Sequence, residues 1–121
     1  MMAAVAMSFA PFLPALAGEA DVVSAKASRE AAGTWRLDVS VRHDDEGWSH
    51  YADRWDVIAP DGRVLGSRIL LHPHETEQPF TRSLGGLEIP GDVRRVIVRT
   101  HDNVHGQGGR EVIVEVPSAA D

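Results

Sequence analysis

Residues 35–43 read WRLDVSVRH, and this stretch decides the fold. Apolar and polar side chains alternate along it with a period of two, which indicates a β-strand with one buried face. The apolar members are Trp35, Leu37, Val39 and Val41. His43 continues the apolar face one step beyond Val41, so we expect its imidazole to point inward at the rim of the core.

Six further segments carry weaker or comparable strand signals, separated by turns or polar loops. They are residues 23–28, 54–59, 64–71, 80–89, 96–101 and 111–116. Pro60-Asp61-Gly62 is a typical turn, because proline presets the backbone and glycine relieves it. The pattern predicts an all-β fold, a seven-stranded antiparallel immunoglobulin-like β-sandwich with Trp55 in its core. A small closed barrel is the alternative.

The N-terminal residues 1–17 are uncharged and mostly apolar, and they end in Ala15-Leu16-Ala17. This pattern predicts a signal peptide cleaved after Ala17, followed by one sandwich domain over residues 18–121. Pro11 and Pro14 make the run a poor membrane span. The chain has no cysteine, so we expect neither a lipid anchor nor membrane insertion after cleavage. The expected location is the bacterial periplasm or the cell exterior.

Composition narrows the class of ligand. The formal net charge is −6 without a Lys/Arg cluster, which argues against nucleic acid and anionic membranes. All three methionines fall in residues 1–7 and cysteine is absent, so a mature chain offers only imidazole and carboxylate ligands. Such ligands suit copper(II), non-haem iron, nickel or zinc. We expect iron or copper, with zinc as the next choice.

All six histidines fall in or beside three strand connections. Because antiparallel neighbours alternate in direction, every second connection lies at the same end of the sandwich. The predicted site therefore combines His43, His50, His72, His74, His101, His105 and Asp102. Pro73 keeps His72 extended, so that His72 and His74 project to the same side. Nearby acids are expected to orient the imidazoles or to bind the ion: Asp44, Asp45, Glu46, Glu75 and Glu77.

Two of these loops resemble a known family. Superoxide reductases, which include the desulfoferrodoxin iron domain, have two histidines separated by about six intervening residues, followed by an aromatic residue and, a few residues later, a tryptophan. His43, His50, Tyr51 and Trp55 match that segment. Their C-terminal Cys-Asn-x-His-Gly loop is similar to residues 102–106, DNVHG. The resemblance implies an immunoglobulin-like fold and an iron centre, with His43, His50 and His105 as equatorial-type ligands.

The chain departs from that family at two ligands. Asp102 stands where the family has its axial cysteine, and no histidine precedes Trp35. His72 or His74 is a spatial substitute for the missing histidine, and Asp102 or His101 for the cysteine. Without the thiolate, the reductase activity of the family does not follow from the resemblance.

Three functions fit these observations. The first is a periplasmic metal-binding protein for transport, buffering or redox, with a metal ion and another periplasmic protein as partners. The second is a metal-free interaction module of the cell envelope. The third is a superoxide-reductase-like redox enzyme. No catalytic arrangement stands out in the sequence, so a non-enzymatic role is favoured; an enzyme would be an iron-dependent oxidoreductase.

Overall fold

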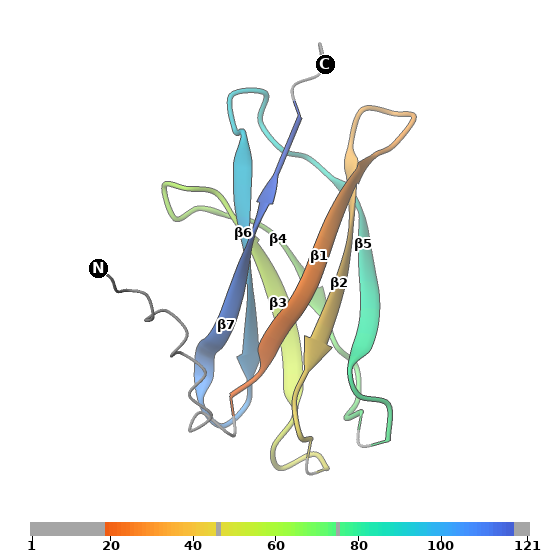
Figure 1. The fold of residues 1–121 in the computed structure, drawn as a ribbon, viewed down its shortest axis with the longest axis vertical. Helices are drawn as coiled ribbons and strands as arrows, with labels where there is room; N and C mark the ends of the chain where they lie inside the picture. Colours follow the sequence, from red (N-terminus) through yellow and green to blue (C-terminus); the bar gives the residue numbers. More distant parts are fainter. Residues whose placement is uncertain (1–18, 46, 75, 118–121) are drawn as a thin grey trace, which may run out of the picture.

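The structure, a computed structural model, describes residues 19–45, 47–74 and 76–117. Seven strands follow one another as the alternation predicts (Figure 1). They are β1 Asp21–Arg29, β2 Trp35–Arg42, β3 Ala52–Ile58, β4 Val64–Ile69, β5 Phe80–Leu87, β6 Arg95–Asp102 and β7 Gly106–Glu115. The predicted signal peptide lies outside the described residues, as do Glu46 and Glu75. Within the described ranges, no helix is long and apolar enough to cross a membrane.

The strands form two antiparallel sheets, with the orders β1-β2-β5 and β4-β3-β6-β7. This arrangement confirms the predicted immunoglobulin-like sandwich, and the closed-barrel alternative is wrong. Strand β4 pairs with β3 because a short turn joins them. In that turn Ala59 N donates to Arg63 O at 2.8 Å, and Gly62 has a φ of 96°. Such a tight turn holds consecutive strands side by side in one sheet.

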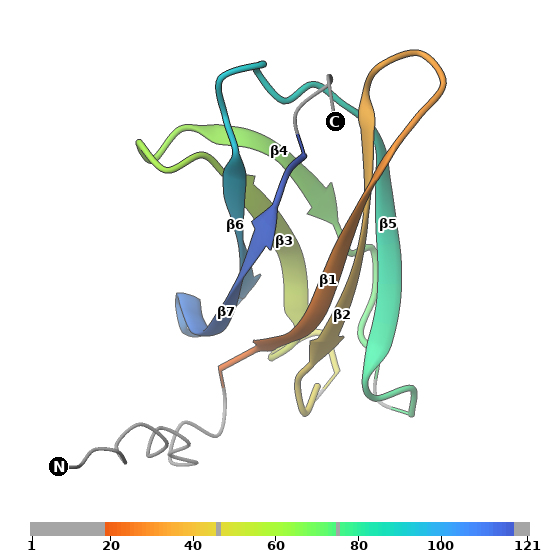
Figure 2. The same cartoon turned by 45° about the horizontal axis from the view of Figure 1, so that its top comes forward.

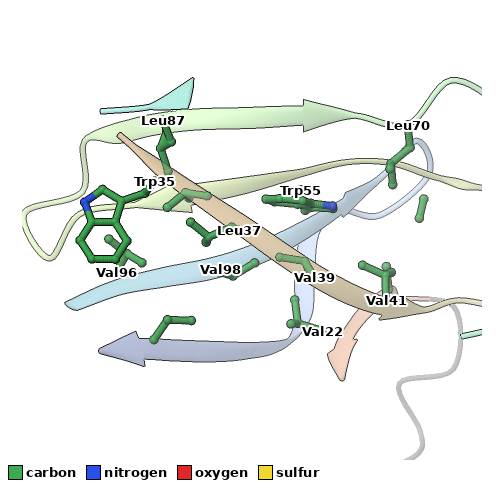
Figure 3. Packing of buried hydrophobic residues seen from close by; sticks show 14 of the residues in the cluster. Val22, Trp35, Leu37, Val39, Val41, Trp55, Leu70, Leu87, Val96 and Val98 are labelled. Atoms are coloured by element: carbon green, nitrogen blue, oxygen red, sulfur yellow. The ribbon is translucent and has the colours of Figure 1, made fainter. Parts of the chain in front are cut away.

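The core lies between the inner faces of the two sheets. The alternating residues Trp35, Leu37, Val39 and Val41 of β2 are buried, and they face Trp55, Val96 and Val98 of the other sheet (Figure 3). Trp55 is fully buried, as the sequence predicts. Burial of a large apolar side chain contributes roughly 1.5–3 kcal/mol, so this packing is the main source of stability for a chain without disulfides.

The β2–β3, β4–β5 and β6–β7 connections lie at one end of the sandwich, the lower end in Figures 1 and 2. We call this end the histidine pole, because every histidine of the chain lies in or beside one of these three connections. The β1–β2, β3–β4 and β5–β6 turns lie at the opposite end. The strand order thus brings residues 43–51, 70–79 and 102–106 to one end of the molecule.

Candidate metal centre

His43 follows β2 directly and keeps the inward direction of that strand. It is 2% exposed, and its Nδ1 contacts a carboxylate oxygen of Asp45. A buried carboxylate next to Nδ1 favours the tautomer in which Nδ1 carries the proton. The lone pair of Nε2 then points away from Asp45, which is the arrangement of a metal-ligating histidine.

His50 returns from the far side of the β2–β3 loop toward His43. The two Nε2 atoms are 3.2 Å apart. The carboxylate of Asp102 lies 3.8 Å from His43 Nε2 and 3.6 Å from His50 Nε2. Two ligand atoms bound to one ion at about 2.1 Å are at most about 4.2 Å apart. All three distances, of which the one to His43 involves Oδ2 of Asp102 and the one to His50 involves Oδ1, are below this limit, so the three side chains fit a single transition-metal ion.

Asp102 ends β6, is 1% exposed and begins the turn that carries His105. Its Oδ1 accepts hydrogen bonds from Val104 N at 2.9 Å and from His105 N at 2.6 Å. Burial acts to raise the pKa of Asp102, but the hydrogen bonds from these amides and from His105 outweigh it and hold the pKa below its ordinary value. The carboxylate is therefore ionised at neutral pH, as a metal ligand must be.

His105 closes the outer side of the cluster. Its Nδ1 lies 3.2 Å from both carboxylate oxygens of Asp102, and its ring centre lies 4.9 Å from that of His50. Gly106, with a φ of 77°, turns the chain back into β7 immediately afterwards. His105 thus contacts the carboxylate of Asp102 through Nδ1, whereas the atoms that converge within 4.8 Å come from His43, His50 and Asp102.

The importance of Asp45 did not follow from the sequence, in which it is one of three consecutive acids. Its side chain is fully buried; Oδ1 accepts from Ala52 N at 3.1 Å and Oδ2 from His74 N at 2.6 Å. Together with His43 Nδ1, these amides give the Asp45 carboxylate three donors. Asp45 therefore links the imidazole of His43 to the start of β3 and to the β4–β5 loop. The sequence could have indicated this role, because Asp45 follows His43 by two residues, and residues i and i+2 of an extended segment point to the same side. Asp44, one residue earlier, is exposed.

Asn103 fastens the two loops that supply the cluster. Its Oδ1 accepts from Tyr51 N at 2.8 Å, and its Nδ2 donates to Trp48 O at 3.0 Å. Trp48 packs edge-on against Tyr51, with ring centres 5.4 Å apart, but remains 65% exposed. The asparagine therefore positions His50 relative to the turn that carries Asp102 and His105.

The other three predicted histidines lie at the same pole but outside this cluster. His101 pairs with Asp53, Nδ1 to Oδ1 at 2.6 Å. It precedes Asp102 in β6, and successive residues of a strand point to opposite faces. His72 and His74 lie next to each other in the β4–β5 loop, with ring centres 4.7 Å apart. The structure thus divides the six histidines into a cluster of three, a pair and a single residue.

Comparison with known proteins finds few relatives. No protein-family profile matches the chain. A protein of Halomicrobium mukohataei described as "Putative lipoprotein" is 41% identical over 102 residues, which cover 84% of this chain and 50% of that protein. The chain therefore spans about half the length of that relative.

A superoxide reductase (1Fe-SOR) from Giardia intestinalis is similar in structure. The match has a TM-score of 0.48 and 13% sequence identity, and it covers 79% of this chain and 99% of that protein. This chain is thus distantly similar to superoxide reductase, as its loop motifs predict, and it lacks the cysteine. The likeness concerns the fold alone.

Proposed function

We propose that this protein binds one transition-metal ion through His43, His50, His105 and Asp102. The observation that carries the proposal is the convergence of two imidazole nitrogens and one carboxylate at a buried point of the histidine pole. A ligand set of three imidazoles and one carboxylate suits iron or copper first and zinc next. An iron or copper ion would supply one-electron redox chemistry there, whereas zinc would supply only Lewis acidity.

The chain's own residues prepare this centre. Asp45 keeps a proton on Nδ1 of His43, and this leaves Nε2 as the ligand atom. The Asp102 carboxylate brings one negative charge, which a bound cation would neutralise inside a largely buried site. A residue that is hydrogen-bonded to a metal ligand, as Asp45 is to His43, often changes the metal affinity by about 10- to 100-fold.

The role we propose is metal transport, buffering or redox outside the cytoplasm, in the cell envelope or the extracellular space. The signal-like residues 1–17 support this location. The description of the Halomicrobium mukohataei relative as a lipoprotein also supports it. Another periplasmic protein that delivers or receives the ion is the corresponding partner.

The test is elemental analysis of the purified protein, with melting curves in the presence and absence of a chelator. An ion bound only by the folded state stabilises it by mass action, by about 2.7 kcal/mol when its concentration is 100 times the dissociation constant. The double variant His50→Ala/His105→Ala removes two partly exposed ligands and leaves the His43–Asp45 contact in place. It should lose one ion per chain, whereas the control His101→Ala should lose none. Equal metal content in wild type and double variant would refute the proposal.

A metal-free interaction module is the second candidate, and one observation favours it. Trp48 is largely exposed at the same pole, where an aromatic side chain is a typical anchor for a partner protein. This function predicts no stoichiometric metal and no effect of a chelator on melting. A superoxide-consumption assay on the iron-loaded protein tests whether it is a superoxide-reductase-like enzyme. Turnover no faster than that of dissolved iron would exclude this function.

A further inference from the structure

His74 is a buried imidazole without a hydrogen bond. It is 5% exposed, and neither Nδ1 nor Nε2 has a hydrogen-bond partner among the described residues. Buried polar side-chain atoms almost always have a partner, because each one left without it loses its bonds to water and gains nothing in exchange. Asp45 Oδ2 lies 3.9 Å from Nδ1 of His74, which is too long for a hydrogen bond.

The orientation of His74 is held from three sides. Its backbone N donates to Asp45 Oδ2 at 2.6 Å, and its carbonyl accepts from Gln78 Nε2 at 2.7 Å. Its ring stacks on Phe80 at 3.9 Å with an interplanar angle of 11°. The two hydrogen bonds fix the backbone of His74, and the stack on Phe80 holds its ring at the buried position. The orientation is therefore built into the fold, and a bound ligand is what would satisfy the nitrogens.

His72 supplies the solvent side of the pair. It is exposed, and its ring centre lies 4.7 Å from that of His74. Two imidazole nitrogens bound to one ion at about 2.1 Å are at most about 4.2 Å apart, which is within reach of rings at this separation. Pro73 between them restricts the backbone, so little conformational freedom remains to be lost on binding.

The charges around the pair are mixed. The Glu77 carboxylate is exposed, and the hydrogen bond from Arg82 is the main cause that holds its pKa below the ordinary value, with smaller contributions from His74 and His72. Arg82 is the adverse charge, but its Nη2 is paired with Glu77 Oε1 at 3.3 Å. Burial, with Arg82 and His72 acting in the same direction, lowers the pKa of His74.

We propose that His72 and His74 form a second metal site, which takes a divalent transition ion such as zinc or copper(II), with Glu77 as its acidic partner. The site shares no ligand with the centre at His43, His50, Asp102 and His105. Asp45 lies between the two, because one of its oxygens contacts His43 Nδ1 and the other binds His74 N. His72 is the exposed member of the pair, and His74 is the buried one.

The experiment is equilibrium dialysis of the metal-free full chain against Zn²⁺. Wild type should hold two ions per chain, and His72→Ala, which changes an exposed side chain, should hold one. The control His101→Ala, a histidine of the same pole outside both sites, should hold two. If His72→Ala binds as many Zn²⁺ ions per chain as wild type, the proposal of a second site is wrong.

The same measurement separates this site from the centre. His50→Ala/His105→Ala should retain one ion, and adding His72→Ala to that variant should bring the number to zero. If the double variant binds no ion while its far-UV circular dichroism matches wild type, the second site is wrong and the centre stands. Proton NMR provides a second readout, because Zn²⁺ should shift the ring resonances of His74 in wild type and leave them unmoved in His72→Ala.

Discussion

Replacement of Asp45 by asparagine tests the geometry of the centre most directly. The carboxylate accepts from three groups: His43 Nδ1, Ala52 N and His74 N. An asparagine has one acceptor oxygen, so it cannot serve both sides. If the oxygen faces His43 and Ala52, the new NH₂ group meets the buried N–H of His74, which loses its acceptor.

The alternative orientation is no better. If the NH₂ group faces His43, the imidazole must accept at Nδ1 and carry its proton on Nε2, which then cannot bind a metal. A lost hydrogen bond to a charged group costs about 1.5–3 kcal/mol, and we expect the metal-free variant to be destabilised by about 2–3 kcal/mol. Its affinity for the ion at the centre should fall by about 10- to 100-fold.

The assays are urea unfolding of the metal-free proteins and competition for Zn²⁺ against a chromophoric chelator, with His72→Ala as the common background so that only the centre is titrated. Asp44→Asn is the matched control, because Asp44 is the exposed neighbour with the same charge. It should change neither quantity beyond experimental error. Wild-type zinc affinity in a folded Asp45→Asn protein would refute the assigned role of Asp45 and the tautomer of His43.

Three further changes have definite expected outcomes. Asn103→Ala removes both side-chain hydrogen bonds of Asn103 that join the β2–β3 loop to the β6–β7 turn. We expect weaker zinc binding at the centre and a loss of about 1 kcal/mol in unfolding free energy. Unchanged zinc affinity would contradict the role of Asn103 in positioning His50. Asp38 has a pKa below its ordinary value because Ser83 Oγ donates to it at 2.5 Å and Arg36 Nε at 3.0 Å. The pKa of Asp38 is lower in the folded than in the unfolded chain, so its contribution to stability is present above about pH 4 and is lost as the pH falls through the folded pKa. Urea unfolding from pH 7 to 2 should therefore show less acid destabilisation for Asp38→Asn than for wild type. Leu37→Ala opens the fully buried core, and calorimetry should show a loss of about 2–5 kcal/mol, whereas a loss below 1 kcal/mol would mean that the two sheets do not pack around it.

Much of the fold followed from local pattern. The alternation in residues 35–41 identified β2 and its buried face, and the number of strands placed the three histidine-bearing connections at one end. The partner of β4 did not follow, because its side chains alternate poorly and both sheets offered an edge. The turn at residues 59–63 decided it by holding β4 beside β3.

The candidate site was only partly predictable. His43 was expected to point inward and does so, and the motif around Asp102 and His105 lies beside it. Asp45 was hidden in a run of three acids, in which composition cannot tell a buried carboxylate from a solvated one. His101 was grouped with the ligands because it is next to Asp102 in sequence, although adjacent strand residues face opposite ways.

The sequence by itself determined the order of the strands along the chain, their buried faces, the absence of cysteine and the concentration of histidines in three connections. These are properties of spacing and composition, which a single chain segment carries without its neighbours. The tertiary structure decided which ring nitrogens converge, which carboxylate holds a proton in place and which imidazole is left without a hydrogen bond. Those properties depend on distances of a few ångströms between loops far apart in sequence, and such distances exist only once both sheets have packed.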